Sequence, residues 1–259
     1  MQVPMPTRFT IAAAQTTPVA GDRVANLAQH VQMVEAAARH GAQLLLFPEL
    51  SLSGYELASL KHCLTSENDP LLAPLKDAAR RHAMTLVVGA PTAATGAPHA
   101  QALPHISALV IGPDGGVQVY HKQHLHPGED RHASQGPTAP FVFDVAGWPC
   151  GQAICADVTH ATHPKAAREA GATLYLAGMV VSGQGYAVDA GLLKAHAITN
   201  RMPVLLANMG SPSGGYLCAG RSAFWDEEGR CVAALPGDGA GLLVVDRQQT
   251  GWVGQGAAL

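Results

Sequence analysis

The sequence predicts an α/β protein in which helices cover a β-sheet. Short apolar segments typical of strands alternate with longer segments whose apolar residues recur every three to four positions, as on one face of a helix. Two pairs of strand-like segments are joined by glycine-containing turns, which is typical of antiparallel hairpins. We therefore expect a mixed sheet between helical layers rather than a purely parallel one.

The N-terminal part of the chain is expected to fold as strand, helix and strand. The helix is predicted over residues 22–40, because its apolar positions have helical spacing and Gly41 follows as a stop signal. The apolar face of this helix consists of Val24, Leu27, Val31 and Val34. The flanking strands are predicted over residues 9–15 and 44–47, and Pro48 ends the second of them.

The remainder of the chain continues this alternation and ends in a β-rich segment. The further expected strands lie at residues 84–89, 106–111, 117–120, 141–145, 149–154, 173–176, 203–207, 222–225, 230–235 and 241–245. The further expected helices lie at residues 71–82, 163–170 and 188–200. No segment has the composition of an interdomain linker, so we expect residues 1–259 to form a single domain.

Composition narrows the class of function. The formal net charge of -3 gives no basic excess, so we expect binding neither to nucleic acid nor to an anionic membrane surface. The apolar runs are too short to span a bilayer, and residues 1–8 lack the apolar core of a secretory signal. Five scattered cysteines without a CxxC pair argue against a disulfide framework and for a reducing compartment. We expect a cytoplasmic enzyme acting on a small molecule.

Three chemically reactive residues directly follow predicted strands. Glu49 follows the strand at 44–47, and Lys122 follows the strand at 117–120. Cys155 follows the apolar segment that ends at residue 154. Functional sites in α/β folds are built at strand ends and in the loops after them, so we expect these three side chains to meet.

The three residue types form a coherent set for attack on a carbonyl or nitrile carbon. A thiolate is a strong nucleophile, so Cys155 is expected to form a thioester or thioimidate. Glu49 is expected to accept the thiol proton and to return it to a departing amine. Lys122 is expected to stabilise the thiolate and the oxyanion, with the backbone N–H of Ala156 as a second oxyanion donor.

Each of these residues also has an ordinary structural interpretation. A cysteine at a strand end is most often a small core hydrophobe, and a charged residue in a loop is most often solvated. The histidines His121, His124, His126, His132, His160 and His163 crowd two segments, but they form no HExxH or paired Cys/His pattern. We therefore expect no metal, and expect His124 to orient the lysine loop. Asp157 is expected to cap the turn after Cys155 by accepting backbone N–H bonds.

The segments Phe47-Pro48-Glu49, 120–125 (YHKQHL) and 151–157 (GQAICAD) resemble, in order and spacing, the three signatures of the nitrilase superfamily, the carbon–nitrogen hydrolases. The resemblance extends over nearly the whole chain, from residue 13 to residue 229. It implies a four-layer αββα sandwich with mixed sheets and a catalytic triad of Glu49, Lys122 and Cys155. It also implies no metal, no organic cofactor, and a homodimer or larger homo-oligomer.

The resemblance suggests further site residues and shows one departure. Glu129 matches a second glutamate that many members use to position substrate and catalytic groups. Met179 and Tyr186 lie in a region that the family uses to line its pocket. After the cysteine, many members have Asp-x-Arg-Phe-Pro-Glu, whereas this chain has residues 157–162 as DVTHAT, without the arginine and the glutamate. The substrate of a known subfamily is therefore not carried over.

Three functions are consistent with these residues. The first is hydrolysis of a small linear amide or N-carbamoyl compound through a Cys155 thioester, with release of ammonia or an amine. The second is hydrolysis of a nitrile to a carboxylic acid by the same triad, which is the minority activity in the superfamily. The third is a non-hydrolytic acyl-transfer or binding role, which is disfavoured because an unused buried Glu–Lys–Cys cluster is costly to keep.

Overall fold

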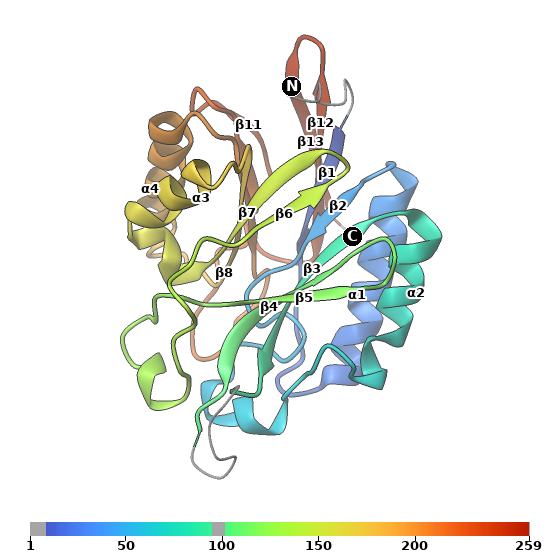
Figure 1. Ribbon diagram of the computed structural model, residues 1–259, viewed down its shortest axis with the longest axis vertical. Coiled ribbons are helices and arrows are strands. Elements are labelled where there is room, and N and C mark those ends of the chain that lie inside the picture. The colour runs from blue at the N-terminus through green and yellow to red at the C-terminus, as the bar shows by residue number, and fades with distance from the viewer. Residues whose placement is uncertain (1–8, 95–101, 259) are drawn as a thin grey trace.

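The computed structural model describes residues 9–94 and 102–258. Two β-sheets face each other, and helices cover the outer face of each (Figure 1). One pair of helices, α1 (Arg23–Arg39) and α2 (Ala73–His82), lies outside the first sheet. The other pair, α3 (Thr162–Glu169) and α4 (Tyr186–Asn200), lies outside the second sheet. The predicted four-layer αββα architecture with mixed sheets is confirmed.

The first sheet has seven strands within the described residues, and we call it the seven-stranded sheet. Its spatial order is β13 (Gly251–Ala258), β12 (Gly241–Gln248), β1 (Phe9–Gln15), β2 (Leu44–Leu46), β3 (Thr85–Thr92), β4 (His105–Ile111) and β5 (Val117–His121). The central strands β1, β2 and β3 are parallel, and the outer pairings are antiparallel. Parallel strands joined by α1 and α2 at the centre place the loop after β2 at the interior of the molecule.

The second sheet has six strands in the same described ranges, and we call it the six-stranded sheet. Its spatial order is β11 (Cys231–Ala234), β10 (Ala223–Trp225), β9 (Val204–Asn208), β8 (Leu174–Met179), β7 (Trp148–Ile154) and β6 (Val142–Val145). Here β7, β8 and β9 are parallel, and hairpins flank them on both sides. Each sheet thus repeats the same plan of a parallel centre with antiparallel edges.

The apolar core is divided by the layers. The largest cluster lies between the two sheets, where the Phe9 and Trp148 rings from opposite sheets stack with centroids 4.9 Å apart. A second cluster joins the seven-stranded sheet to α1 and α2, and a third joins the six-stranded sheet to α3 and α4. Because burial of apolar surface is the main favourable contribution to folding, these three clusters hold the four layers together.

The first helix forms where it is predicted, but its buried face differs from the expected one. Asp22 caps it by accepting hydrogen bonds from the backbone N–H groups of residues 24 and 25. Asn26 is buried and bonds both the N–H and the C=O of Val19 and the C=O of Leu52. Residues two apart point to nearly opposite sides of a helix, so this network turns Val24 outward, and 68 % of it is exposed. The assignment of Val24 to the apolar face is therefore wrong.

Other differences concern short or weakly marked elements. The structure adds the short 3-10 helices η1 (Leu57–His62), η2 (Pro70–Leu72), η3 (Glu129–Arg131) and η4 (Cys155–Thr159). It also adds β13, whose glycines and alanines lack a strand signal but whose backbone pairs with β12 along its whole length. Within the described residues no helix is long and apolar enough to cross a membrane. The N-terminal segment 1–8, which lacks the apolar core of a secretory signal, lies outside the described residues.

Candidate active site

The structure brings together the three residues that follow predicted strands. Glu49 lies in the loop after β2, and Lys122 directly follows β5, both in the seven-stranded sheet. Cys155 directly follows β7 in the six-stranded sheet. The facing sheets therefore supply the two sides of one site, with the carboxylate and the amine on one side and the thiol on the other.

Lys122 is the centre of the polar group. Its Nζ donates to Glu49 Oε1 at 2.7 Å and to Glu129 Oε1 at 2.7 Å. All three side chains are fully shielded from solvent. One cation between two buried carboxylates leaves one negative charge uncompensated, and that shortage of positive charge governs the protonation of the site.

The pKa of Glu49 is raised to about 7. Burial is the largest cause, and the nearby Glu129 carboxylate acts in the same direction, while Lys122 opposes both. Burial also lowers the pKa of Lys122, but Glu49, Cys155 and Glu129 outweigh it, so the amine pKa lies above its ordinary value. Lys122 is therefore a permanent cation, and Glu49 exchanges its proton near neutral pH.

Cys155 is held in a strained backbone conformation. Its φ is 43°, in the left-handed region that residues with a side chain rarely adopt, and it opens the short helix η4. Its Sγ lies 4.0 Å from the backbone oxygen of Val180, and the residue as a whole is half-buried. Burial of the sulfur and the nearby Glu49 hold the thiol pKa well above its ordinary value, so the resting residue is a neutral thiol.

Glu49 is placed to take the thiol proton. Its Oε1 accepts from Lys122, whereas its buried Oε2 has no hydrogen-bond partner in residues 9–94 and 102–258. Contact with the Cys155 thiol contributes to the pKa of Glu49. A buried carboxylate oxygen without a partner beside a neutral thiol is the arrangement that a general base requires.

Glu129 is anchored by three donors from the described residues. Its Oε1 accepts from Lys122 and from the hydroxyl of Tyr55, and its Oε2 accepts from the backbone N–H of His126 at 2.7 Å. These three donors fix the Glu129 carboxyl group against Lys122. The resemblance implied this positioning role, and the contacts are consistent with it.

Tyr55 is a site residue that sequence reasoning missed. It is buried, and burial together with the two carboxylates raises its pKa above the ordinary range, so it remains a hydrogen-bond donor. It lies six positions after Glu49, beyond the loop that carries the base, and no pattern in the sequence marks it. Only the fold shows that this loop returns to Glu129.

Ala156 is the residue whose backbone N–H is expected to stabilise an oxyanion, and this role stays a prediction. Ala156 is buried in the first turn of η4, directly after Cys155. First-turn N–H groups of a helix have no intrahelical acceptor, so this N–H is suited to receive an oxyanion.

The two expected pocket-wall residues make other contacts. Met179 is the last residue of β8, and its side chain lies in the apolar cluster between the six-stranded sheet and its helices. Val180, the next residue, packs into the cluster between the sheets, because successive strand residues face opposite sides. Tyr186 begins α4, where its hydroxyl donates to the backbone oxygen of Arg221 at 2.7 Å. The roles of Met179 and Tyr186 in a pocket stay predictions.

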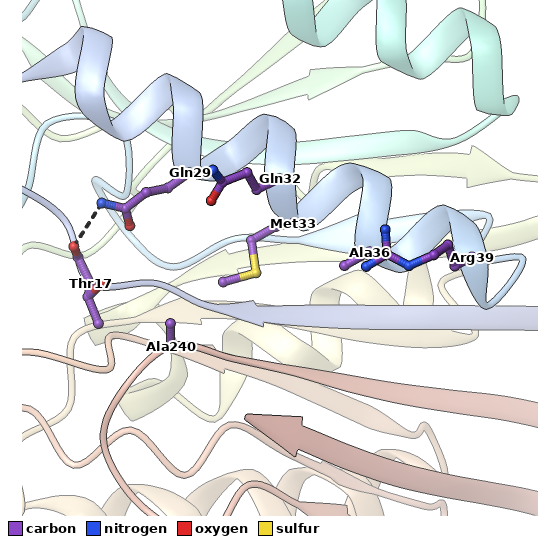
Figure 2. A pocket seen from close by; sticks show the side chains of 7 residues that line it. All are labelled: Thr17, Gln29, Gln32, Met33, Ala36, Arg39 and Ala240. Carbon is purple, nitrogen blue, oxygen red and sulfur yellow. Dashed lines mark hydrogen bonds between the residues drawn. The ribbon is translucent and has the colours of Figure 1, made fainter. Parts of the chain in front are cut away.

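A separate cavity of about 340 Å³ lies on the helix side of the seven-stranded sheet (Figure 2). It is lined by Thr17, Gln29, Gln32, Met33, Ala36, Arg39 and Ala240. Gln29 donates across it to the backbone oxygen of Thr17 at 3.2 Å. None of these residues belongs to the group around Lys122, so this cavity is distinct from the site between the sheets.

Comparisons with known proteins agree with this geometry. The sequence model of the family described as carbon-nitrogen hydrolase matches residues 10–253, so the chain belongs to the carbon–nitrogen hydrolase family of the nitrilase superfamily. The chain is 29% identical to an amidase from Nesterenkonia sp. AN1 whose structure holds butyramide, with a TM-score of 0.82 over 92% of this chain and 90% of that one.

Two further matches bear on the chemistry. A second structure of that amidase shows the acetamide moiety of fluoroacetamide attached at the active-site cysteine, with 30% identity and a TM-score of 0.82 over 94% of this chain and 92% of that chain. A glutamine-dependent NAD(+) synthetase of Rhodobacter capsulatus is 26% identical over 95% of this chain, which spans only 44% of that relative's length. The protein is thus a carbon–nitrogen hydrolase that resembles an amidase with an active-site cysteine.

Proposed function

We propose that the protein hydrolyses the C–N bond of a small linear amide through a thioester on Cys155 and releases ammonia or an amine. The observation that carries the proposal is the half-buried Cys155 thiol beside a buried Glu49 carboxyl whose pKa is about 7. The amidase structures with butyramide and with an acetamide group on the cysteine support the choice of an amide.

In the first half-reaction the thiol proton moves to Glu49 as Sγ attacks the amide carbon. The C=O bond opens to an oxyanion, which Lys122 Nζ and the N–H of Ala156 stabilise. The oxyanion then reforms the carbonyl, the C–N bond breaks, and Glu49 gives its proton to the departing nitrogen. The products are a neutral amine and an acyl thioester on Cys155.

In the second half-reaction a water molecule replaces the amine. Glu49 takes one proton from the water, whose oxygen attacks the thioester carbon, and the same two donors stabilise the second oxyanion. Collapse breaks the C–S bond, and the proton on Glu49 returns to sulfur. The sum of both halves is amide plus water giving carboxylic acid plus amine, and the enzyme is regenerated.

The test is release of ammonia from butyramide by Cys155→Ala and by Cys150→Ala. Cys150 lies on β7, fully buried five residues before the nucleophile, so it is a matched control for the loss of a thiol. We expect Cys155→Ala to lose activity by about 10³-fold or more, and Cys150→Ala to keep most of it. Mass spectrometry of the wild type should show the butyryl group on the peptide that contains Cys155. Ammonia release by Cys155→Ala at the wild-type rate would refute the proposal.

The same assay separates the neighbouring substrate classes. Butyronitrile tests nitrile hydrolysis, an N-carbamoyl amine tests the carbamoyl class, and glutamine tests the reaction suggested by the name of the synthetase relative. We expect the simple amide to be the fastest. Release of one equivalent of ammonia with a thioester that persists, and no release of butyric acid, would instead favour an acyl-transfer role. A cytoplasmic location and a homodimer or larger homo-oligomer stay predictions from the sequence.

A further inference from the structure

Asp157 connects the two strand ends that carry the nucleophile and the cation. It lies two residues after Cys155, within η4, and it is fully buried. Its Oδ2 accepts from the backbone N–H of Ile154 at 2.9 Å, on the residue directly before the nucleophile. The capping bond expected from the sequence is therefore present, as a side chain in the first turn of η4 that reaches back to the residue before the helix, but it is only half of what the carboxylate does.

The other oxygen of Asp157 reaches the opposite sheet. Its Oδ1 accepts from the backbone N–H groups of Gln123 at 3.0 Å and of His124 at 2.8 Å. These are the two residues that directly follow Lys122. One carboxylate thus bonds the backbone beside Cys155 with one oxygen and the backbone beside Lys122 with the other.

We propose that Asp157 is a positioning residue that sets the placement of Cys155 relative to Lys122 across the two sheets. Cys155 and Lys122 are carried by strands that share no hydrogen bonds, because β5 and β7 belong to different sheets. Packing between sheets would by itself let each strand end shift by fractions of an ångström. Charge-assisted hydrogen bonds to rigid backbone groups oppose such a shift. The strained backbone of Cys155 needs such a restraint to persist.

The side chains around Asp157 keep it ionised. Tyr120 donates its hydroxyl proton to Oδ2 at 2.6 Å, and His124 Nδ1 lies 3.2 Å from Oδ1. Burial would raise the pKa of Asp157, but the bonds from His124, Tyr120 and Ile154 and the nearby His163 outweigh it and lower the pKa. A protonated acid could not accept from all five donors, so the bridge requires the carboxylate.

His163 supports this arrangement from the helix layer. Its Nε2 lies 2.9 Å from the Tyr120 hydroxyl, and its Nδ1 lies 2.8 Å from the Tyr175 hydroxyl. Because Tyr120 gives its only proton to Asp157, Nε2 must donate to Tyr120, and the neutral ring then accepts from Tyr175. His163 directly follows residues 157–162, the segment in which this chain departs from the family pattern. Its ring holds the Tyr120 hydroxyl against Asp157.

The decisive measurement is the pH dependence of Cys155 alkylation by iodoacetamide, read on the Cys155 peptide because Cys231 is also exposed. In the wild type the rate should rise through pH 7, because Glu49 accepts the thiol proton with a pKa of about 7. In Asp157→Asn this rise should move to higher pH, because a displaced Cys155 thiol passes its proton to Glu49 less readily, while burial still holds the thiol pKa above its ordinary value. This readout needs no turnover.

Turnover gives a second readout that rests on the proposed amidase function. With butyramide, Asp157→Asn should lower kcat by about 100-fold, as expected for a misplaced reacting group, and change KM by less than about threefold. If the wild type does not hydrolyse amides, the proposed function fails, and the alkylation profile still decides the role of Asp157. The two failures are therefore distinguishable.

Two further variants keep the test decisive. Asp226→Asn removes another buried carboxylate, whose hydrogen bonds among the described residues all go to residues 228 and 230 of its own hairpin, and it should leave the profile and kcat unchanged. Tyr120→Phe keeps the carboxylate and removes one donor, so it should shift the profile in the same direction by less. A wild-type alkylation profile in Asp157→Asn, or in Tyr120→Phe if Asp157→Asn does not fold, overturns the proposal.

Discussion

The loop that carries Glu49 and the turn that carries Cys155 are held in place by different physical means. The Glu49 loop is fixed by close backbone packing. A Cβ added to Gly89 on β3 would lie 2.2 Å from the backbone oxygen of Pro48, and one added to Gly178 on β8 would lie 2.8 Å from that of Phe47. The Cys155 turn is instead fixed by hydrogen bonds to the Asp157 side chain. Each segment contains one non-glycine residue with a positive φ, Cys155 at 43° and Leu50 at 50°.

This difference corresponds to the different chemical roles that we propose for Glu49 and Cys155. A general base is useful when burial raises its pKa, so Glu49 gains from a dry, tightly packed loop that excludes water. A nucleophile must meet its substrate, so Cys155 cannot be buried in the same way and depends on directional polar bonds. We expect the Glu49 loop to be sensitive to added volume and the Cys155 turn to be sensitive to lost charge.

The largest expected effect comes from removing the cation that both sides share. Lys122→Met leaves Glu49 and Glu129 buried without a positive partner, which should destabilise the fold by about 3–5 kcal/mol and lower kcat by about 10³-fold or more. Thermal unfolding and ammonia release from butyramide measure the two losses. Lys165→Met, which breaks an exposed pair with Glu169 on α3, should leave both quantities nearly unchanged. An active, stable Lys122→Met would show that the two sides do not depend on a common charge.

Activity and stability should change in opposite directions with pH, because both depend on the protonation of Glu49. Catalysis requires ionised Glu49, so kcat/KM should fall by about tenfold per unit as the pH drops below about 7. The free energy of unfolding should instead fall as the pH rises, because the pKa of this carboxyl in the folded protein is raised above its ordinary value of 4.5. Its stabilising contribution is full below pH 4.5 and is lost as the pH rises through 7.

Comparison of the wild type with Glu49→Gln checks this sign. The variant should lose activity at every pH, and its melting temperature should decline less between pH 5 and pH 8 than that of the wild type, since the glutamine does not titrate. If the melting temperatures of the two proteins declined by the same amount across that pH range, the raised pKa of Glu49 would be contradicted.

A smaller effect on kcat is expected from loss of the hydrogen bond between Tyr55 and Glu129. Tyr55→Phe removes one of the donors to Glu129 while Lys122 and the N–H of His126 remain, so kcat should fall by about tenfold. Tyr186→Phe is the matched control, because its hydroxyl bonds the backbone oxygen of Arg221 instead. If Tyr186→Phe lowers kcat or raises KM more than Tyr55→Phe does, the expected pocket role of Tyr186 gains support.

The smallest expected effect on activity tests the packing itself. Gly178→Ala places a methyl group against the Glu49 loop, which should cost about 1–3 kcal/mol of unfolding free energy and a few-fold in kcat. Gly183→Ala is the control, because a Cβ there meets no atom of the described chain within 4 Å. Urea unfolding and ammonia release measure both variants. Equal stabilities would indicate that the Glu49 loop yields to added volume and is not held by packing.

Much of the fold and the triad could be predicted because both depend on local patterns. Strand and helix segments are marked by apolar periodicity, and β1 has the predicted bounds at residues 9–15. Glu49, Lys122 and Cys155 are recognisable because each follows such a strand. On α1, Leu27 and Val34 are buried as predicted, whereas Val24 was misassigned because the hydrogen bonds of Asn26, and not hydrophobic spacing, set the rotation of the first turn.

The sequence by itself determined which groups we expect to perform the chemistry, since the roles of nucleophile, base and cation follow from residue types placed after strands. Only the tertiary structure decided how these groups share protons and how they are held. Tyr55 meets Glu129 from 74 positions away, and Asp157 meets Gln123 from 34 positions away. The pKa of a buried group depends on burial and on neighbours brought from distant segments, and no local pattern records those distances.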